Sequence, residues 1–169
     1  MIKPLNIQKW IADNRDQLRP PIGNKRIFTD NDDFIVMAVG GPNARKDYHT
    51  QAGEEIFYQL EGNVKVGLIQ DGTHSIIDLL EGEMLLVPAH TPHKPMRPAG
   101  TVGLVIERKR AENETDYFSW YCEQCENLLH TSPLKLMDIE RELPIVMEAF
   151  FSDEKLHACK KCGTVMAKP

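Results

Sequence analysis

The sequence predicts a β-dominated fold: a small barrel of antiparallel strands, with one helix before it and a metal-binding extension after it. Two observations carry this prediction. Between residues 25 and 110, short apolar runs alternate with Gly, Asp and Pro turn signals at steps of roughly ten residues, as in barrels and sandwiches. Beyond this region, all four cysteines fall in two CxxC pairs, a spacing typical of metal sites.

The composition narrows the class of protein. A charged fraction of 27% and a hydrophobic fraction of 41% are those of a globular chain. The net charge of −5 disfavours a nucleic-acid partner, which needs a basic surface. No apolar run approaches the ~20 residues of a membrane helix, and residues 1–17 lack the apolar core of a signal peptide. We therefore expect a cytoplasmic protein that binds neither nucleic acid nor membranes.

Residues 6–18 predict a short amphipathic helix. Asn6 is suited to the N-cap, and Pro20 and Pro21 end the helix because proline cannot continue it. Apolar side chains recur at the spacing of one helix face, at Ile7, Trp10, Ile11 and Leu18.

Six apolar runs then predict strands, at residues 34–40, 55–62, 64–72, 75–82, 83–88 and 102–107. No segment between them is long enough for a helix that would connect parallel strands. The polar stretch 111–116 marks a boundary, which divides the chain into a barrel at 1–110 and an extension at 111–169. Within the extension, residues 143–151 are the best helix candidate.

Two spaced motifs place metal-binding residue types where strands turn. The first is G-x5-D-x-H-x5-E-x6-G, which contains His49 and Glu55, and the second is G-x5-P-x-H-x2-H-x3-R, which contains His93. Inward-facing side chains from separate strands can meet inside a barrel. Two imidazoles and one carboxylate suit Fe(II) and leave coordination positions open for substrate and oxygen. We predict that His49, Glu55 and His93 bind a catalytic metal.

These motifs resemble the paired motifs of the cupin superfamily, with Asp47 in place of a usual histidine and Arg97 in place of a usual asparagine. GGPNARKDYHTQAGEEIFYQLEGN, at 40–63, resembles the 3-hydroxyanthranilate 3,4-dioxygenase family. PPIGN at 20–24, LVIERKR at 104–110 and the cysteine-containing tail fit the bacterial branch of that family. The resemblance covers nearly the whole chain.

The resemblance implies a cupin barrel and an Fe(II)-dependent, extradiol-type ring cleavage of 3-hydroxyanthranilate by O2. The product would be 2-amino-3-carboxymuconate semialdehyde, which cyclises to quinolinate, a precursor of NAD. The resemblance also implies a homodimer.

The same resemblance assigns roles to five residues. Arg97 would bind the substrate carboxylate, for which a bidentate guanidinium is well suited. Glu107 would contact the ring substituents, and Arg45 would lie beside dioxygen, where a cation stabilises developing negative charge. Glu55 would take the substrate's proton while it holds the metal, and Asn24 would close over the ligand.

Other polar residues near the motifs receive different interpretations. Asp47 is either a weak fourth ligand or a group that supports the ligands, and we favour support. His90 replaces a usual glycine of the second motif, and we expect it to be a neighbour of the site rather than a ligand. Arg108, Lys109 and Arg110 are expected to face solvent as a basic cluster.

The cysteines Cys122, Cys125, Cys159 and Cys162 resemble the two knuckles of rubredoxin. Four thiolates close a tetrahedron around iron or zinc. Because no coordination position stays open, we expect a structural role, in which the metal compensates for the small core of the extension.

Two further classes of function stay open at this stage. A metal-dependent cupin isomerase acting on sugar phosphates would need several basic residues around the pocket. A ligand-sensing cupin without catalysis would not need the three metal ligands. A related cupin dioxygenase acting on another aminophenol or catechol carboxylate is the nearest alternative. The joint presence of Arg45, Arg97 and Glu107 favours the 3-hydroxyanthranilate reaction.

Overall fold

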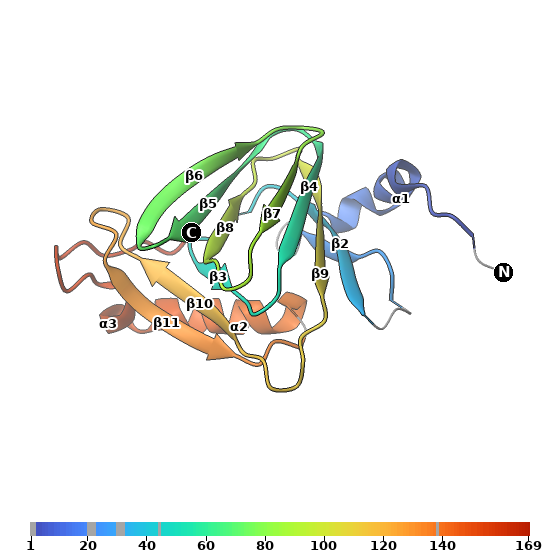
Figure 1. Ribbon diagram of the computed structural model, residues 1–169. Helices are drawn as coiled ribbons and strands as arrows, with labels where there is room; N and C mark the ends of the chain where they lie inside the picture. Colours follow the sequence, from blue (N-terminus) through green and yellow to red (C-terminus); the bar gives the residue numbers. More distant parts are fainter. Residues whose placement is uncertain (1–2, 20–22, 30–32, 44, 138) are drawn as a thin grey trace.

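The computed structural model describes residues 3–19, 23–29, 33–43, 45–137 and 139–169. Two antiparallel sheets face each other (Figure 1). The five-stranded sheet has the order β1 (Asn24–Arg26), β2 (Phe34–Gly40), β9 (Val102–Arg108), β4 (Glu55–Glu61) and β7 (Met84–Val87). The six-stranded sheet has the order β11 (Leu128–Leu134), β10 (Asp116–Tyr121), β3 (Tyr48–Thr50), β8 (His93–Met96), β5 (Val64–Gln70) and β6 (Thr73–Leu79). The predicted β-dominated barrel is confirmed.

The six predicted apolar runs form β2, β4, β5, β6, β7 and β9, and their inward side chains make the core between the sheets. In β4, buried and half-buried residues alternate from Glu55 to Gln59, as the two-residue period of a strand requires. Phe57 of this strand packs with Val66 of the facing sheet and with Val105 of the neighbouring strand. Five strands were not predicted: β1, β3, β8, β10 and β11.

The predicted N-terminal helix is confirmed as α1 (Ile7–Asn14), which continues into a 3-10 turn at Arg15–Gln17. The Asn6 side chain accepts a hydrogen bond from the backbone N–H of Lys9 at 2.9 Å and so caps the helix. Ile11 and Leu18 are buried with Ala38 of β2 and Val102 of β9, so the helix covers the outer face of the five-stranded sheet. Pro20 and Pro21 lie outside the described residues.

The extension begins as a continuation of the barrel. β10 pairs with β3, with Phe118 opposite His49, and β11 then pairs with β10 as a hairpin. After the hairpin come α2 (Ile139–Ser152), which contains the predicted helix, and the short α3 (Glu154–His157). The division of the chain at residue 110 stays a prediction, but the six-stranded sheet includes strands from both sides of that point.

The extension has an apolar core of its own, between β10 and α2 (Figure 1). The rings of Trp120 and Phe150 stack with centroids 4.2 Å apart, and both side chains are fully buried. Phe118 and Leu143 join them, so the inward aromatic side chains of β10 serve packing. None of the helices in the described residues is long and apolar enough to cross a membrane.

This core makes a testable prediction about the extension. Phe150→Ala should lower the free energy of unfolding by about 3–5 kcal/mol, because it removes a buried ring and leaves a cavity against Trp120. Chemical denaturation of the metal-loaded protein measures this. Tyr117→Ala is the matched control, because the Tyr117 side chain on β10 is 45% exposed. Equal destabilisation by the two substitutions would contradict the packing described.

Candidate active site

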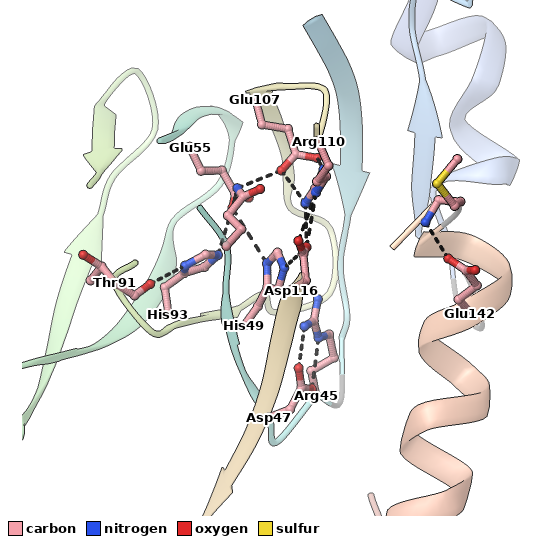
Figure 2. Close-up of polar contacts among 12 residues, drawn as sticks. Arg45, Asp47, His49, Glu55, Thr91, His93, Glu107, Arg110, Asp116 and Glu142 are labelled. Atoms are coloured by element: carbon pink, nitrogen blue, oxygen red, sulfur yellow. Dashed lines mark hydrogen bonds and ion pairs between the residues drawn. The ribbon is translucent and has the colours of Figure 1, made fainter. Parts of the chain in front are cut away.

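Three potential metal ligands meet between the sheets. His49 of β3 and His93 of β8 are paired across the six-stranded sheet, and Glu55 begins β4 in the opposite sheet. Their ligand atoms all lie within 4.8 Å of one another, and all three side chains are buried. Figure 2 shows the two imidazoles and the carboxylate converging from these strands. The structure therefore brings together the residues that the spacing of the two motifs singled out.

The hydrogen bonds of this cluster suit a divalent cation. The Thr91 carbonyl oxygen lies 3.0 Å from His93 Nδ1, while His93 Nε2 lies 2.9 Å from Glu55 Oε2. Although burial alone raises the pKa of Glu55, the neighbouring His93 and His49 lower it to about 2. A bound cation would take the place of the proton shared by Glu55 and His93, as metal binding to imidazole requires.

Three residues that the sequence did not place at the site surround these ligands, and Figure 2 labels two of them, Asp116 and Arg110. Asp116 Oδ2 lies 2.7 Å from His49 Nε2. Gln51 donates from Nε2 to Glu55 Oε2 and to Glu107 Oε2, both at 2.9 Å. Arg110 forms ion pairs with Glu107 and with Asp116.

The expectation that Arg110 faces solvent is therefore wrong. Its side chain is only 11% exposed, whereas Arg108 points outward and pairs with Glu114. The strand β9 ends at Arg108, so the alternation of faces does not continue to Arg110. The turn that follows directs Arg110 back toward Glu107 and Asp116.

A cavity of about 710 Å³ opens onto the ligands. Its walls come from both sheets, and one side is formed by apolar residues of α2, among them Leu143, Met147 and Phe151. Every predicted barrel site residue lines it: Asn24, Arg45, His49, Glu55, His93, Arg97 and Glu107. The extension thus contributes a wall of the cavity in addition to its cysteines.

Arg97 presents a buried guanidinium to the cavity. Its Nη1 donates to Gln59 Oε1 at 3.1 Å, and its Nε finds no hydrogen-bond partner among the described residues. Gly103 leaves space for it, because a Cβ there would lie 2.8 Å from Arg97 Nη1. Burial lowers the pKa of Arg97 to about 10. A buried cation with an unsatisfied donor favours an anionic ligand.

Arg45 is held differently from Arg97. Its Nε and Nη2 donate to the two carboxylate oxygens of Asp47, which is fully buried. Burial alone raises the pKa of Asp47, but the charge of Arg45 and its hydrogen bond lower it. Asp47 is not among the clustered ligands and instead orients Arg45 at the cavity wall.

His90 is exposed and lies outside the ligand cluster. Its φ of 61° is in the left-handed region, which explains why the motif usually has glycine at this position. Its interpretation as a neighbour of the site fits this position.

The four cysteines form a second cluster of possible metal ligands. All four are free thiols, with Cys122 Sγ 3.5 Å from Cys162 Sγ and Cys125 Sγ 3.6 Å from Cys159 Sγ. Each CxxC segment forms the same turn, closed by a backbone bond to the first cysteine from Glu126 or from Gly163. Hydrogen bonds from Thr164 lower the pKa of Cys162 to about 6, which favours the thiolate that a metal binds.

The barrel and its ligand cluster define a metal-binding protein of the cupin superfamily. The chain belongs to the 3-hydroxyanthranilic acid dioxygenase family, whose model matches residues 1–151. This confirms the family indicated by residues 40–63.

Relatives named 3-hydroxyanthranilate 3,4-dioxygenase match almost the whole length of the chain. A 3-hydroxyanthranilate 3,4-dioxygenase from Neurospora crassa is 43% identical over 162 residues, which cover 96% of this chain and 89% of that protein. The Burkholderia cenocepacia protein of that name is 44% identical and covers 96% of this chain and 92% of its own. The Paraburkholderia phytofirmans protein is 46% identical, with coverage of 96% and 94%.

The two ligand clusters should load independently. Cys122→Ser should remove metal from the extension and lower the thermal midpoint, while the barrel keeps its metal. His49→Ala should remove metal from the barrel while the cysteine cluster keeps its metal, and the thermal midpoint should be nearly unchanged. Elemental analysis of metal per chain, together with thermal unfolding, measures both variants. Loss of both metals in Cys122→Ser would contradict separate sites.

Proposed function

We propose that this chain cleaves the ring of 3-hydroxyanthranilate with O2 and forms 2-amino-3-carboxymuconate semialdehyde, which cyclises to quinolinate. One observation carries the proposal most directly. A single cavity joins an open cluster of two histidines and a glutamate to the buried, incompletely paired guanidinium of Arg97. The names of the relatives supply the substrate.

Arg97 would hold the substrate carboxylate. The guanidinium has a free Nε and a fixed planar fork, so a carboxylate can satisfy it through two parallel hydrogen bonds. The low-dielectric surroundings strengthen this pairing relative to water. The carboxylate anchor then fixes where the hydroxyl and amino groups of the ring lie relative to His49, Glu55 and His93.

We propose Fe(II) as the metal of this cluster, because a facial set of two histidines and one carboxylate is typical of iron oxygenases. Bound there, Fe(II) would supply the coupling between the electron-rich ring and dioxygen. Arg45, oriented by Asp47, places a positive charge at the cavity wall where negative charge develops on oxygen. Glu55, the carboxylate of the ligand cluster, would accept the proton that the substrate hydroxyl gives up.

The remaining walls suit an aromatic ring. Apolar side chains of the five-stranded sheet and of α2 line the cavity: Met37, Phe57 and Val105 from the sheet, and Leu143 and Met147 from the helix. These side chains exclude water and contact the faces of a planar ligand. A cavity of about 710 Å³ is within the usual size of small-molecule sites, roughly 300–1,000 Å³.

The charge of the cavity favours this substrate over a sugar phosphate. Arg45 already donates to both carboxylate oxygens of Asp47, so its fork is not free to hold a ligand anion, and the Lys168 ammonium pairs with Glu148. Among the described arginines and lysines that line the cavity, this leaves Arg97 to bind a ligand. A single guanidinium matches the charge of one carboxylate better than that of a phosphate dianion.

Three further assignments belong to the same proposal. The four-cysteine cluster would hold a second iron or a zinc ion, and its free thiols fit a reducing cytoplasm. We also propose a homodimer. Ile76 of β6 and Met84 and Leu86 of β7 are exposed on strands at the sheet edges, where a second copy could cover them.

An anaerobic mixing experiment tests the reaction. Protein reconstituted with Fe(II) and mixed with 3-hydroxyanthranilate should, on exposure to air, consume one O2 per substrate and give a transient semialdehyde absorbance. His49→Ala should abolish turnover while its circular dichroism stays that of the parent chain. Absence of both oxygen uptake and semialdehyde from the parent protein would overturn the proposal.

The role of Arg97 predicts a specific kinetic pattern. Arg97→Met should lower kcat/KM by about 30-fold or more, because losing one partner of a buried charge pair costs about 2–5 kcal/mol. Arg97→Lys should recover part of the loss, since it keeps the charge but not the bidentate fork. Steady-state kinetics measure both variants, and a normal kcat/KM in Arg97→Met would exclude it as the carboxylate anchor.

A further inference from the structure

We infer that Asp116, Arg110 and Gln51 are positioning residues. They link the metal ligands to Glu107 in one ring of contacts, in which hydrogen bonds run from His49 to Glu55 and the 4.0 Å separation of His49 Nδ1 and Glu55 Oε2 closes the ring. The inference rests on the proposed function in that it takes His49 and Glu55 as ligands and Glu107 as a substrate contact. It adds three residues to the site, and two of them come from the connection after β9 and from β10.

Asp116 fixes the orientation of His49. Its Oδ2 lies 2.7 Å from His49 Nε2, and the side chain is 1% exposed. With Nε2–H donating to Asp116, the other ring nitrogen, Nδ1, faces Glu55 Oε2 at 4.0 Å and is left for a metal. Phe118, one of the strand neighbours of Asp116, stacks on the imidazole with centroids 5.0 Å apart. A carboxylate behind a ligating histidine sets the ring orientation and raises the basicity of the ligand.

Arg110 joins Asp116 to Glu107. Its Nη2 donates to Asp116 Oδ2 at 3.0 Å and to Glu107 Oε2 at 3.1 Å, and its Nη1 donates to Glu107 Oε1. The guanidinium thus pairs with two buried carboxylates at once. Its rigid fork sets the separation of the two acids, which a lysine ammonium could not do.

Gln51 connects Glu107 to the metal ligand Glu55. Its Nε2 donates both to Glu107 Oε2 and to Glu55 Oε2 at 2.9 Å. The side chain is buried, and an amide NH2 has two hydrogens, so both bonds can form together. The ring therefore runs from His49 through Asp116, Arg110, Glu107 and Gln51 to Glu55.

This ring leaves Glu107 with one oxygen available to a ligand. Among the residues that the structure describes, Oε2 accepts from Gln51 and from Arg110, whereas Oε1 accepts from Arg110 alone. A carboxylate oxygen has about two acceptor positions, so Oε1 keeps one for a donor in the cavity. The ring thereby selects a ligand with a hydrogen-bond donor, such as the amino group of 3-hydroxyanthranilate, beside Glu107.

Metal affinity tests the His49 side of the ring. Mn(II) is the probe, because it prefers oxygen and nitrogen ligands over thiolates and so reports on the barrel rather than on the cysteines. In Mn(II) titrations of the full chain followed by electron paramagnetic resonance, Asp116→Ala should raise Kd by about 10–100-fold. Asp116→Asn, which keeps an acceptor for His49 and nearly the same shape, should raise Kd less and serves if the alanine variant does not fold.

Ligand selectivity tests the Glu107 side. Anaerobic titration of the Mn(II)-loaded protein with 3-hydroxyanthranilate and with 3-hydroxybenzoate, which lacks the amino group, gives a ratio of two Kd values. Arg110→Met should reduce the preference for 3-hydroxyanthranilate by about 10-fold or more, the effect of one charge-assisted hydrogen bond. The preference of Arg110→Lys for 3-hydroxyanthranilate should lie between those of the parent protein and Arg110→Met. Arg108→Met is the matched control, because Arg108 pairs with Glu114 on the surface of the same connection.

The outcomes separate the inference from the proposed function. If the parent protein binds Mn(II) and prefers 3-hydroxyanthranilate, but the Asp116 and Arg110 variants match the Arg108 control, the ring has no positioning role and the inference is wrong. If the parent protein binds neither Mn(II) nor either ligand, the proposed function itself fails.

Discussion

The dominant constraint on this structure is the burial of charge between the two sheets. Glu55, Glu107, Arg97, Asp116 and the two histidines all have less than a tenth of their surface exposed. A buried charge costs several kcal/mol unless it is paired and hydrogen-bonded. Most of these groups are paired inside the barrel, through Gln51 and Arg110 and across His93 to Glu55. Arg97 is the group left with an unsatisfied donor, and it lies where a ligand can complete it.

The need to pair buried charges explains why polar and apolar residues are separated along β4 and β9. β4 begins with Glu55 in the polar cluster and continues with Phe57 in the apolar core, both on the inward face. β9 runs the opposite way, from the apolar core at Val105 to the polar cluster at Glu107. Because the strands are antiparallel, Glu55 and Glu107 are paired in register at the same end of the barrel. One end thus stabilises the fold by apolar burial, and the other holds the reactive groups.

The sequence predicted the strands that carry the apolar core and missed those that carry the histidines. β3 and β8 are short, and His49 and His93 occupy inward positions where an apolar residue would have marked a strand. The ligands were found instead from their fixed spacing and framing glycines and prolines. Asp116 had no such signal, because it is 67 residues from His49 and lies in a stretch whose polarity indicated a boundary. Arg110 was misplaced for a related reason: three basic residues in a row do not show where the strand ends.

The same reasoning gives the extension a role beyond its cysteines. β10 contributes Asp116 to His49, and α2 contributes apolar side chains to the cavity wall. These two elements are held together by the stack of Trp120 on Phe150. The cysteine cluster joins the end of β10, at Cys122, to the turn after α3, at Cys159. A metal there would restrain both ends of the segment that contains α2, and so would stabilise a wall of the cavity while contributing no group to the chemistry inside it.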